Sequence, residues 1–394
     1  MLKTYSFSII LILSVFLGGF TGHIFGESVR CLKPLGDIFL NLIFTAIVPL
    51  VFFSVSSAIA RAGVLGKLTK ILSSMTLVFL ITSAIAAALT IIVVKIFPPA
   101  KDVYLALNMP AAVPTGDFLN QIAGIFTVPE FSKLLSHTNM LALILFAILI
   151  GLGSTSSQVF TSFLNAGEAV LMRVFSYIMY FAPIGFFAYF AVLVSELGPA
   201  LIQSYVRVSV IYYVFAVIYF IAAYSLYAYW AGKRAGVRTF WKYVSLPATT
   251  SVATCSSAAS IPANLIAARS MGISAEVYET VVPLGAILHK EGSVIGGVVK
   301  IAFLFGIFHM NFSGASVLLM ALGVSLLVGT VMGAIPSGGM LGELLILTVY
   351  GFPSEALVVI AAISVIIDPI ATLLNVTGNT VSSMMVARMV DRKQ

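Results

Sequence analysis

The sequence VVPLGAILHKEGSVIGGVVKIAFLFGIF, residues 281–308, decides how this chain folds. It is apolar and long enough to cross a bilayer, which takes about 20 residues, yet His289, Lys290 and Glu291 stand inside it. Ionisable groups at that depth are costly and mark functional positions in membrane proteins. A surface turn between two spans, or an internal salt bridge, would explain the triplet without a function.

The composition of the whole chain indicates a membrane protein. Of its 394 residues, 60% are hydrophobic and only 9% are charged. So few charges cannot coat a water-facing surface, which excludes an ordinary soluble enzyme and a disordered protein. The net charge of +7 is spread along the chain without a dense basic patch, so we expect a lipid bilayer as partner and no nucleic acid.

The first half of the chain predicts six membrane spans. Their approximate ranges are 5–25, 35–59, 71–97, 140–156, 171–197 and 204–231. The polar stretch 98–138 is expected to form an outside loop. Lys and Arg gather in short loops separated by even numbers of spans, which predicts an inner-membrane protein with both termini in the cytoplasm.

The second half predicts two interrupted hairpins, each followed by an interrupted helix. The hairpin tips lie at 254–262 and 333–339, and the helices are interrupted at 289–293 and 375–379. Irregular backbone at membrane depth must be enclosed by protein. Taken singly, each tip also fits an ordinary interhelical loop. As a pair, they resemble the inverted repeats of secondary transporters, whose interrupted elements line the binding site.

A polar stripe in the last apolar segment is a second candidate site. Asp368 is a carboxylate in apolar surroundings, so it needs a cationic partner such as Lys290 or a substrate ammonium. Thr372, Asn375 and Asn379 share a helical face with it. A capping Asp at a surface break and a hydrogen-bonded seam between helices are the alternatives without a function.

Three further charged residues lie in apolar contexts. We expect Arg207 and Glu343 to form structural pairs or interface positions. We expect Lys300 to extend its ammonium to the membrane surface. None of the three is assigned a role in transport from the sequence.

These motifs resemble those of the glutamate transporter family, the dicarboxylate/amino-acid:cation symporters. The similarity covers essentially the whole chain and is strongest over residues 254–388. The family's first hairpin tip corresponds to residues 256–262, and its seventh-helix Asn-Met-Asp-Gly-Thr break corresponds to residues 289–293. Its second hairpin tip corresponds to residues 335–339, and its eighth-helix Asn-Val-Thr-Gly-Asp signature corresponds to residues 375–379.

The resemblance implies an all-α polytopic membrane protein that works as a homotrimeric, elevator-type transporter. It would have eight transmembrane helices and two re-entrant helical hairpins with inverted repeats. The implied division is 1–70 for scaffold helices 1–2, 71–97 for transport-domain helix 3, 98–200 for the extracellular loop and scaffold helices 4–5, and 201–394 for the transport-domain helix 6, hairpin 1, helix 7, hairpin 2 and helix 8.

The resemblance also implies a substrate site. Asp368 stands where the family binds the substrate amino group, and Asn375 and the hairpin tip near Ser257 stand where it holds the α-carboxylate. Ala371 replaces the arginine that grips an acidic side chain, and a methyl group cannot replace a guanidinium. Small or neutral amino acids are therefore the expected substrates. The implied substrate contacts are Ser256, Ser257, Ser293, Ile335, Gly339, Asp368, Ala371, Thr372 and Asn375.

The sodium sites that the resemblance implies are altered. The family's seventh-helix ligands become His289, Lys290 and Glu291, and an ammonium cannot coordinate Na⁺ because it has no lone pair. A third sodium site keeps Thr82 and Ser83 but loses a tyrosine hydroxyl. The implied ion or coupling residues are Thr82, Ser83, His289, Lys290, Glu291, Asn375 and Asn379.

From these changes we expect Lys290 to act as a built-in cation that pairs with Glu291, Asn379 or Asp368. Transport would then be sodium-independent, either by exchange or coupled to protons through His289 and Glu291. The candidate coupling ions are Na⁺ and H⁺, and no other cofactor is expected.

Two other transport functions stay open. The first is a sodium- or proton-coupled glutamate/aspartate or dicarboxylate symporter, in which Lys290 or another basic group replaces the missing arginine. The second is an anion-conducting, channel-like member of the family. An enzyme is not expected, because the chain has neither a His-Glu-x-x-His motif nor a nucleophile elbow.

Overall fold

The computed structural model describes residues 2–63, 69–100, 127–136, 139–197, 199–331 and 339–391, and every regular element in these ranges is a helix. Ile335, the rest of the second hairpin tip before Gly339, and most of the stretch 98–138 lie outside the described residues. The elements are α1 (Leu2–Phe25), the 3-10 helix η1 (Gly26–Leu32), α2 (Lys33–Gly63), α3 (Thr69–Ile96), α5 (Phe131–Leu134), α6 (Met140–Ser154), α7 (Gln158–Tyr180), α8 (Ala182–Leu197), α9 (Pro199–Tyr243), α10 (Ser245–Thr254), α11 (Ile261–Ser270), α12 (Ala275–Leu288), α13 (Glu291–Ile307), α14 (Ala315–Val331), α15 (Gly339–Tyr350) and α16 (Ala356–Asp391).

Three helices in the described part of the chain are long and apolar enough to cross a membrane. They comprise Lys70–Ile96 of α3, Gln203–Tyr243 of α9 and Ala356–Val390 of α16. Large apolar side chains are also exposed along the outer faces of α1, α3 and α9. Lipid or other protein must cover such faces. The all-α membrane fold expected from the sequence is therefore confirmed.

Two of the predicted spans differ from the helices that form. The span 171–197 is divided between α7 and α8 by a turn at Phe181, two residues before Pro183, which has no amide hydrogen to donate. The span 204–231 is only the first part of α9. Gly232 and Lys233 have non-helical backbone angles and kink this helix, which then continues to Tyr243.

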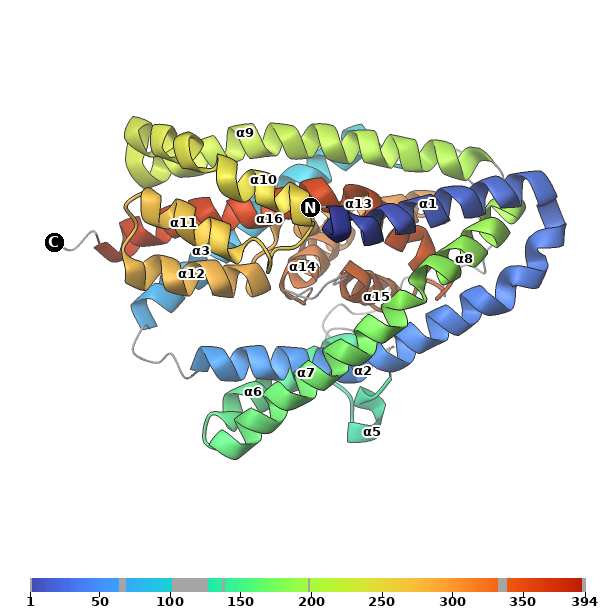
Figure 1. The fold of residues 1–394 in the computed structure, drawn as a ribbon, viewed down its shortest axis with the longest axis horizontal. Helices are drawn as coiled ribbons and strands as arrows, with labels where there is room; N and C mark the ends of the chain where they lie inside the picture. Colours follow the sequence, from blue (N-terminus) through green and yellow to red (C-terminus); the bar gives the residue numbers. More distant parts are fainter. Residues whose placement is uncertain are drawn as a thin grey trace.

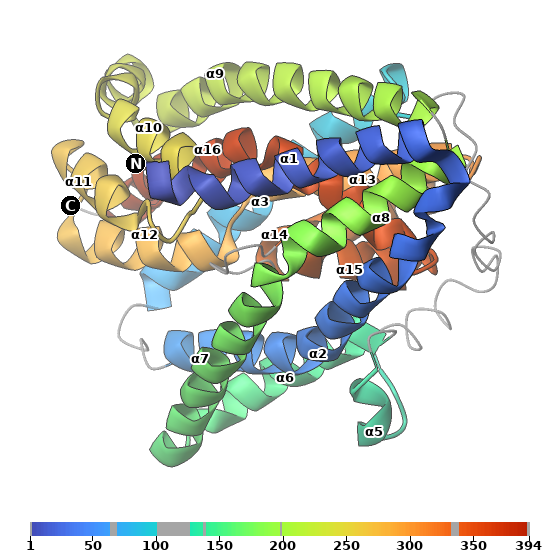
Figure 2. The same ribbon diagram turned by 45° about the vertical axis from the view of Figure 1, so that its right-hand side comes forward.

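The helices pack in two groups. One group contains α1, α2, α6, α7 and α8, and the other packs α3, α9–α12, α14 and α15 around α13 and α16 (Figures 1 and 2). In the first group, Gly18 and Gly22 of α1 lie against the backbone carbonyls of Phe187 and Ala191 in α8, where a Cβ would overlap the oxygen. Small residues allow helix backbones to approach this closely. The second group holds the buried polar residues singled out in the sequence.

The stretch 281–308 forms two helices separated by an extended gap. His289 (φ −132°, ψ 109°) and Lys290 (φ −139°, ψ 78°) lie between the end of α12 and the start of α13. Every residue of α13 except Gly306 is buried. The gap is therefore enclosed by protein, as irregular backbone at membrane depth requires, and a surface turn is excluded.

The predicted interruption at 375–379 is wrong. Helix α16 continues from Ala356 to Asp391 through these residues and also contains Pro369. The Thr377 hydroxyl donates to the Leu373 carbonyl of its own helix at 2.6 Å. A hydroxyl that donates to a carbonyl in the preceding turn has its hydrogen-bond partner within the helix. The polar residues at 375–379 are therefore compatible with an uninterrupted helix.

Both predicted hairpins are pairs of packed helices. The turn between α10 and α11 begins at Cys255, whose φ of 46° is left-handed. Asn264 of α11 donates from Nδ2 to the Val376 carbonyl at 2.9 Å and accepts from Thr380 Oγ1 at 2.5 Å. This buried amide fastens the first hairpin to α16. The second hairpin consists of α14 and α15.

We predict that Asn264→Ala loosens the first hairpin. The substitution leaves the Val376 carbonyl and the Thr380 hydroxyl with fewer partners, which costs about 1–3 kcal/mol of unfolding free energy. Thermal unfolding in detergent measures the change. Thr249→Ala in α10 is the matched control, because the Thr249 hydroxyl is exposed and bonds only within α10. Equal Tm values for the two variants would contradict this account.

Candidate functional site

His289 is the centre of a buried polar group in which three elements meet. Its Nδ1 lies 2.9 Å from Asn379 Oδ1 on α16, and its Nε2 lies 2.9 Å from Thr82 Oγ1 on α3. An amide oxygen only accepts, so Nδ1 carries the hydrogen that is donated to Asn379. Nε2 then accepts from Thr82 when the ring is neutral and donates when it is protonated.

Glu291 stands beside His289 and is fully buried. Its Oε1 lies 3.3 Å from His289 Nε2, and the two side chains are 0% and 1% exposed. Neither oxygen of Glu291 has a hydrogen-bond partner among the described residues. A buried carboxylate without a partner is costly.

Aromatic side chains enclose the His289–Glu291 pair. The Phe79 ring stacks on the His289 imidazole with centroids 4.2 Å apart and planes at 4°. The Tyr224 hydroxyl and Glu291 both face Gly378, where a Cβ would lie 2.8 Å from the hydroxyl oxygen and 3.4 Å from Glu291 Oε2. The Phe79 ring thus covers one face of the imidazole with carbon atoms and offers it no oxygen.

Sequence reasoning missed the tyrosines of α9. Their hydroxyls donate to backbone carbonyls of α13 and α16 at 2.7–3.0 Å, in the pairs Tyr205–Val359, Tyr212–Gly292, Tyr213–Ile366 and Tyr224–Leu374. The sequence held a signal for two of them, because Tyr205 and Tyr212 are seven residues apart and so share one helical face.

Lys290 and Asp368 form an oppositely charged part of the site. Lys290 is 6% exposed, and no described carboxylate lies within 4.0 Å of its ammonium. Asp368 Oδ1 accepts from Thr372 Oγ1 at 3.4 Å. The two charges interact electrostatically without forming an ion pair. The expected direct pairing of Lys290 with Glu291, Asn379 or Asp368 is therefore absent from this structure.

Ser293 and Asn375 form a seam between α13 and α16. Asn375 Oδ1 accepts from the Ser293 amide at 3.2 Å, and Asn375 Nδ2 donates to Ser293 Oγ at 3.3 Å. Ala371, on the same helix, touches Gly292 through its carbonyl oxygen. The seam fixes the first turn of α13 against the polar stripe of α16.

The remaining predicted residues are placed around this centre. Ser256 Oγ accepts from the Ala259 amide at 3.2 Å within the first hairpin turn. Ser257 is half-buried in that turn, and its neighbour Cys255 interacts electrostatically with Asp368. Ser83 is buried on α3, and Gly339 begins α15. The structure shows no hydrogen bond from either serine to Asp368.

Lys300 is buried instead of reaching the membrane surface, so that expectation is wrong. Its Nζ donates to Glu343 Oε1 at 2.7 Å and to the Ser364 hydroxyl. The structural pairing expected for Glu343 is confirmed. Arg207 is exposed, and its Nε donates to the Pro98 carbonyl at 2.7 Å.

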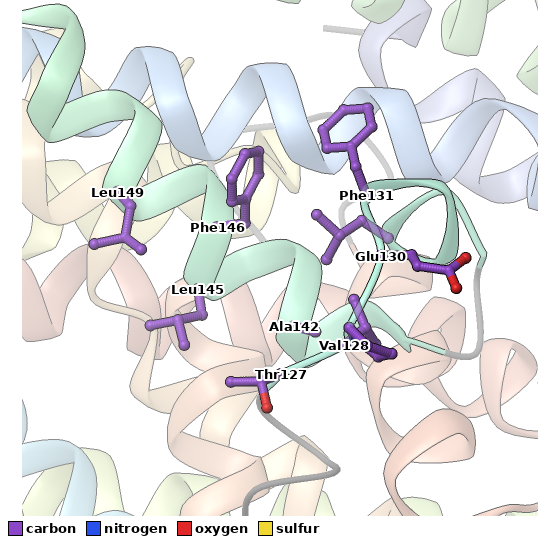
Figure 3. A pocket seen from close by; sticks show the side chains of 10 residues that line it. Thr127, Val128, Glu130, Phe131, Ala142, Leu145, Phe146 and Leu149 are labelled. Atoms are coloured by element: carbon purple, nitrogen blue, oxygen red, sulfur yellow. The ribbon is translucent and has the colours of Figure 1, made fainter.

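An apolar hollow of about 250 Å³ lies away from this site, next to α5 and α6 (Figure 3). Figure 3 shows Phe131, Phe146 and Leu149 among the side chains that line it. Glu130 is the ionisable residue in its wall. None of the residues singled out in the sequence borders this hollow, so it is not part of the candidate site.

A helical, charge-poor chain with an enclosed break and buried, unpaired charges is typical of polytopic membrane transporters. The model of the sodium:dicarboxylate symporter family matches residues 7–389, and the chain belongs to this family. The family consists of secondary transporters, so the chain is a multi-pass membrane transporter and not an enzyme.

Relatives of different substrate class align over nearly the whole chain. A C4-dicarboxylate transport protein of Anaeromyxobacter sp. (strain K) is 26% identical over 96% of this chain and 88% of the relative. A proton/sodium-glutamate symport protein of Geobacillus stearothermophilus is 27% identical over 96% and 93%. A proton/glutamate-aspartate symporter of Bacillus subtilis (strain 168) is 24% identical over 98% and 95%.

We predict that Gly285→Ala disrupts the hydrogen bond between His289 and Asn379. A Cβ at Gly285 would lie 2.5 Å from Asn379 Oδ1 and 3.1 Å from Phe79 Cζ, so it displaces the acceptor of His289. Overpacking of this kind costs about 1–3 kcal/mol, measured as unfolding free energy in detergent.

Gly323→Ala in α14 is the matched control, because nothing lies within 4 Å of its Cβ. Alanine is the better helix former, so this control should be as stable as the parent or more stable. A Gly285→Ala protein as stable as Gly323→Ala, with unchanged transport, would show that the glycine is not required.

Proposed function

We propose that the chain is a proton-coupled, sodium-independent carrier of a small neutral amino acid. The observation that carries this proposal is the pair of unsatisfied charges, the Lys290 ammonium and the Asp368 carboxylate. A neutral amino acid is a zwitterion with one ammonium and one carboxylate. Asp368 would hold the ammonium and Lys290 the carboxylate, so that each charge gains the partner it lacks.

The supply of cations around the site favours a neutral substrate over an acidic one. A second carboxylate on the substrate would need another positive group. Lys300 is already engaged by Glu343, and Ala371 stands where acidic-amino-acid members of the family carry arginine. A buried carboxylate without a cation is strongly disfavoured, so the described residues suit one carboxylate better than two.

Proton coupling is supported by the charge balance around α13. Among the described residues, this region holds three carboxylates, Glu291, Glu343 and Asp368, but only two ammonium groups, Lys290 and Lys300. One proton on the His289–Glu291 pair makes the group neutral. Thr82, Asn379 and Glu291 offer oxygens at this place. The imidazole and the ammonium offer none and compete for them, so we propose the proton and not Na⁺ as the coupling ion.

The family's architecture supports the rest of the proposal. The group of α1, α2, α6, α7 and α8 would be a fixed scaffold, and α3 with α9–α16 would move across the inner membrane as an elevator. This division follows the packing of the helices. We further propose eight transmembrane helices with two re-entrant hairpins, a homotrimer, and termini in the cytoplasm, as the Lys and Arg distribution favours.

The second candidate is a cation-coupled glutamate or C4-dicarboxylate symporter. Two observations favour it. The relatives named above are described as transporters of glutamate, aspartate or C4-dicarboxylates. The buried Lys290 ammonium would serve equally well as the cation for a substrate carboxylate. The choice between the two candidates depends on whether the substrate carries an ammonium for Asp368.

We predict that proteoliposomes containing the chain accumulate alanine or serine when the outside is acidic and Na⁺ is replaced by choline. Glutamate and succinate should compete at least about tenfold more weakly, because a second buried carboxylate lacks a cation. Radiolabelled uptake under imposed pH and Na⁺ gradients measures this directly.

In the same assay, Glu291→Gln should retain exchange of amino acid but lose accumulation driven by the pH gradient, since an amide cannot share the proton with His289. A strict Na⁺ requirement of the parent would overturn the coupling proposal. Preference for glutamate or succinate over alanine would favour the second candidate.

We predict that Lys290→Met raises the KM for the neutral amino acid by about tenfold or more, because a buried charge-assisted contact is lost. Lys95→Met is the matched control, since Lys95 is exposed on α3. Concentration-dependent uptake gives both KM values. A Lys290→Met protein with parental KM for alanine, but without inhibition by glutamate, would assign the ammonium to acidic substrates instead.

A further inference from the structure

The end of α9 is a separate short helix that turns away from the long one. Gly232 and Lys233 have non-helical backbone angles, and helical geometry resumes after them. Tyr224 and Phe240 are sixteen residues apart in the sequence, which in a straight helix is about 24 Å. Their ring centroids are nevertheless only 6.3 Å apart, and Figure 2 shows this end turned out of line with the rest of α9. Residues 234–243 are called the return segment below.

One face of the return segment packs on the long part of α9. Phe240 is 0% exposed, and the Trp241 indole donates from Nε1 to Ser225 Oγ at 2.9 Å. A Cβ on Gly236 would overlap the Ala228 carbonyl oxygen, so the two backbones approach closely there. These contacts occupy the apolar side of the segment and hold it against the long helix.

The opposite face of the return segment is positively charged. Arg234, Arg238 and Lys242 follow one another at intervals of four residues, so they share a helical face, and all three are exposed. Lys233 is exposed beside them at the turn. Among the described residues, no carboxylate lies within 4.0 Å of these four cationic groups. The return segment itself contains neither Asp nor Glu.

The position of the return segment indicates membrane lipid as its partner. It ends α9, which is long and apolar enough to cross a membrane, and Leu226, Tyr229 and Trp230 are exposed just before the turn. Exposed Tyr and Trp at the end of a span are typical of the headgroup level, where cations attract anionic lipids. Where α1 leads into α2, at the opposite end of the molecule (Figure 1), Arg30 is instead paired with Glu27 at 3.3 Å.

We propose that Lys233, Arg234, Arg238 and Lys242, the basic face of the return segment, bind the phosphate headgroups of anionic phospholipids. A guanidinium group matches phosphate oxygens with paired N–H donors, and an ammonium group adds a point charge. Residues four apart are separated by about 6 Å along the helix, so the face presents a row of cations. Binding holds this end of α9 at the membrane surface. The inference goes beyond the proposed function, because it depends on neither the substrate nor the coupling ion.

The tryptophans give this face a spectroscopic readout of its own. Trp230 precedes the turn, Trp241 lies in the return segment, and the chain contains no other tryptophan. The chain is reconstituted in phosphatidylcholine vesicles that contain an equal minor share of brominated phosphatidylglycerol or of brominated phosphatidylcholine. We expect the brominated phosphatidylglycerol to quench tryptophan fluorescence about twofold more strongly, because charge attraction enriches it around the segment. Equal quenching by the two lipids would overturn the inference.

Neutralising the basic face should remove this preference. The test variant carries three substitutions on the face, Arg234→Gln, Arg238→Gln and Lys242→Gln. The matched control removes three exposed charges from other elements, Arg30→Gln, Lys33→Gln and Lys95→Gln. We expect equal quenching by the two lipids in the test variant and the parental preference in the control. A preference that persists in the test variant, or is lost equally in the control, would contradict the assignment to this face.

Salt provides a test on the unmodified chain, which decides the inference even if the test variant does not fold. Added NaCl screens exposed charges, so the preference for phosphatidylglycerol should fall as its concentration rises. A preference that salt does not change would overturn the inference. Relief of quenching by inorganic phosphate, but not by chloride at the same ionic strength, would assign the face to free phosphate and would also overturn it.

Lys233→Gly separates the charge at the turn from the shape of the turn. The φ of Lys233 is 53°, which glycine adopts without strain. The variant should therefore unfold at a higher temperature than the parent, while its preference for phosphatidylglycerol falls. A stabilised variant with the full parental preference would contradict the assignment of Lys233 to the basic face.

Discussion

A backbone group without a hydrogen-bond partner cannot face lipid, and the arrangement of the second helix group depends on that constraint. The extended gap at His289 and Lys290 leaves the end of α12 and the start of α13 incomplete. α13 is buried on all sides, so these incomplete helix ends do not face lipid. Tyrosine hydroxyls of α9 also donate to the Gly292 carbonyl of α13 and the Leu374 carbonyl of α16, so α9 is held against both helices. An interrupted helix is thus stable only at the centre of the group, which is where a site shielded from lipid is needed.

The same enclosure explains why few charges are sufficient for the site. Within a region of low dielectric constant, each charge acts strongly on its neighbours and must be balanced locally. Three pairs of charged side chains in the chain are balanced in different ways. Lys300 and Glu343 satisfy each other and position helices. His289 Nε2 and Glu291 Oε1 lie 3.3 Å apart and, in the proposed function, share the coupling proton. Lys290 and Asp368 form no ion pair, and in the proposed function each would bind one charge of the substrate.

The sequence was sufficient to predict features that follow from length and pattern. Long apolar runs gave the helical membrane fold, and the apolar flanks of His289, Lys290 and Glu291 gave their burial. Features that depend on distant segments could not be predicted. Lys300 and Glu343 are 43 residues apart, so nothing local indicated that they meet. The helical continuity of α16 through 375–379 was missed because the polar side chains there satisfy their own helix.

A requirement of neutrality connects the coupling ion to the substrate. Moving a net charge through a low-dielectric barrier costs many kcal/mol. Among the described residues, Glu291, Glu343 and the partly buried Asp368 stand against Lys290 and Lys300. With every group charged, the formal balance is one negative charge, which a proton at His289 and Glu291 would cancel in the proposed function. A zwitterionic substrate would then leave the group neutral, whereas an acidic amino acid would add a negative charge and require a second proton. In the proposed function, Lys290 therefore bears on both the coupling ion and the substrate, because its fixed positive charge would replace one mobile cation and leave one proton to complete the balance.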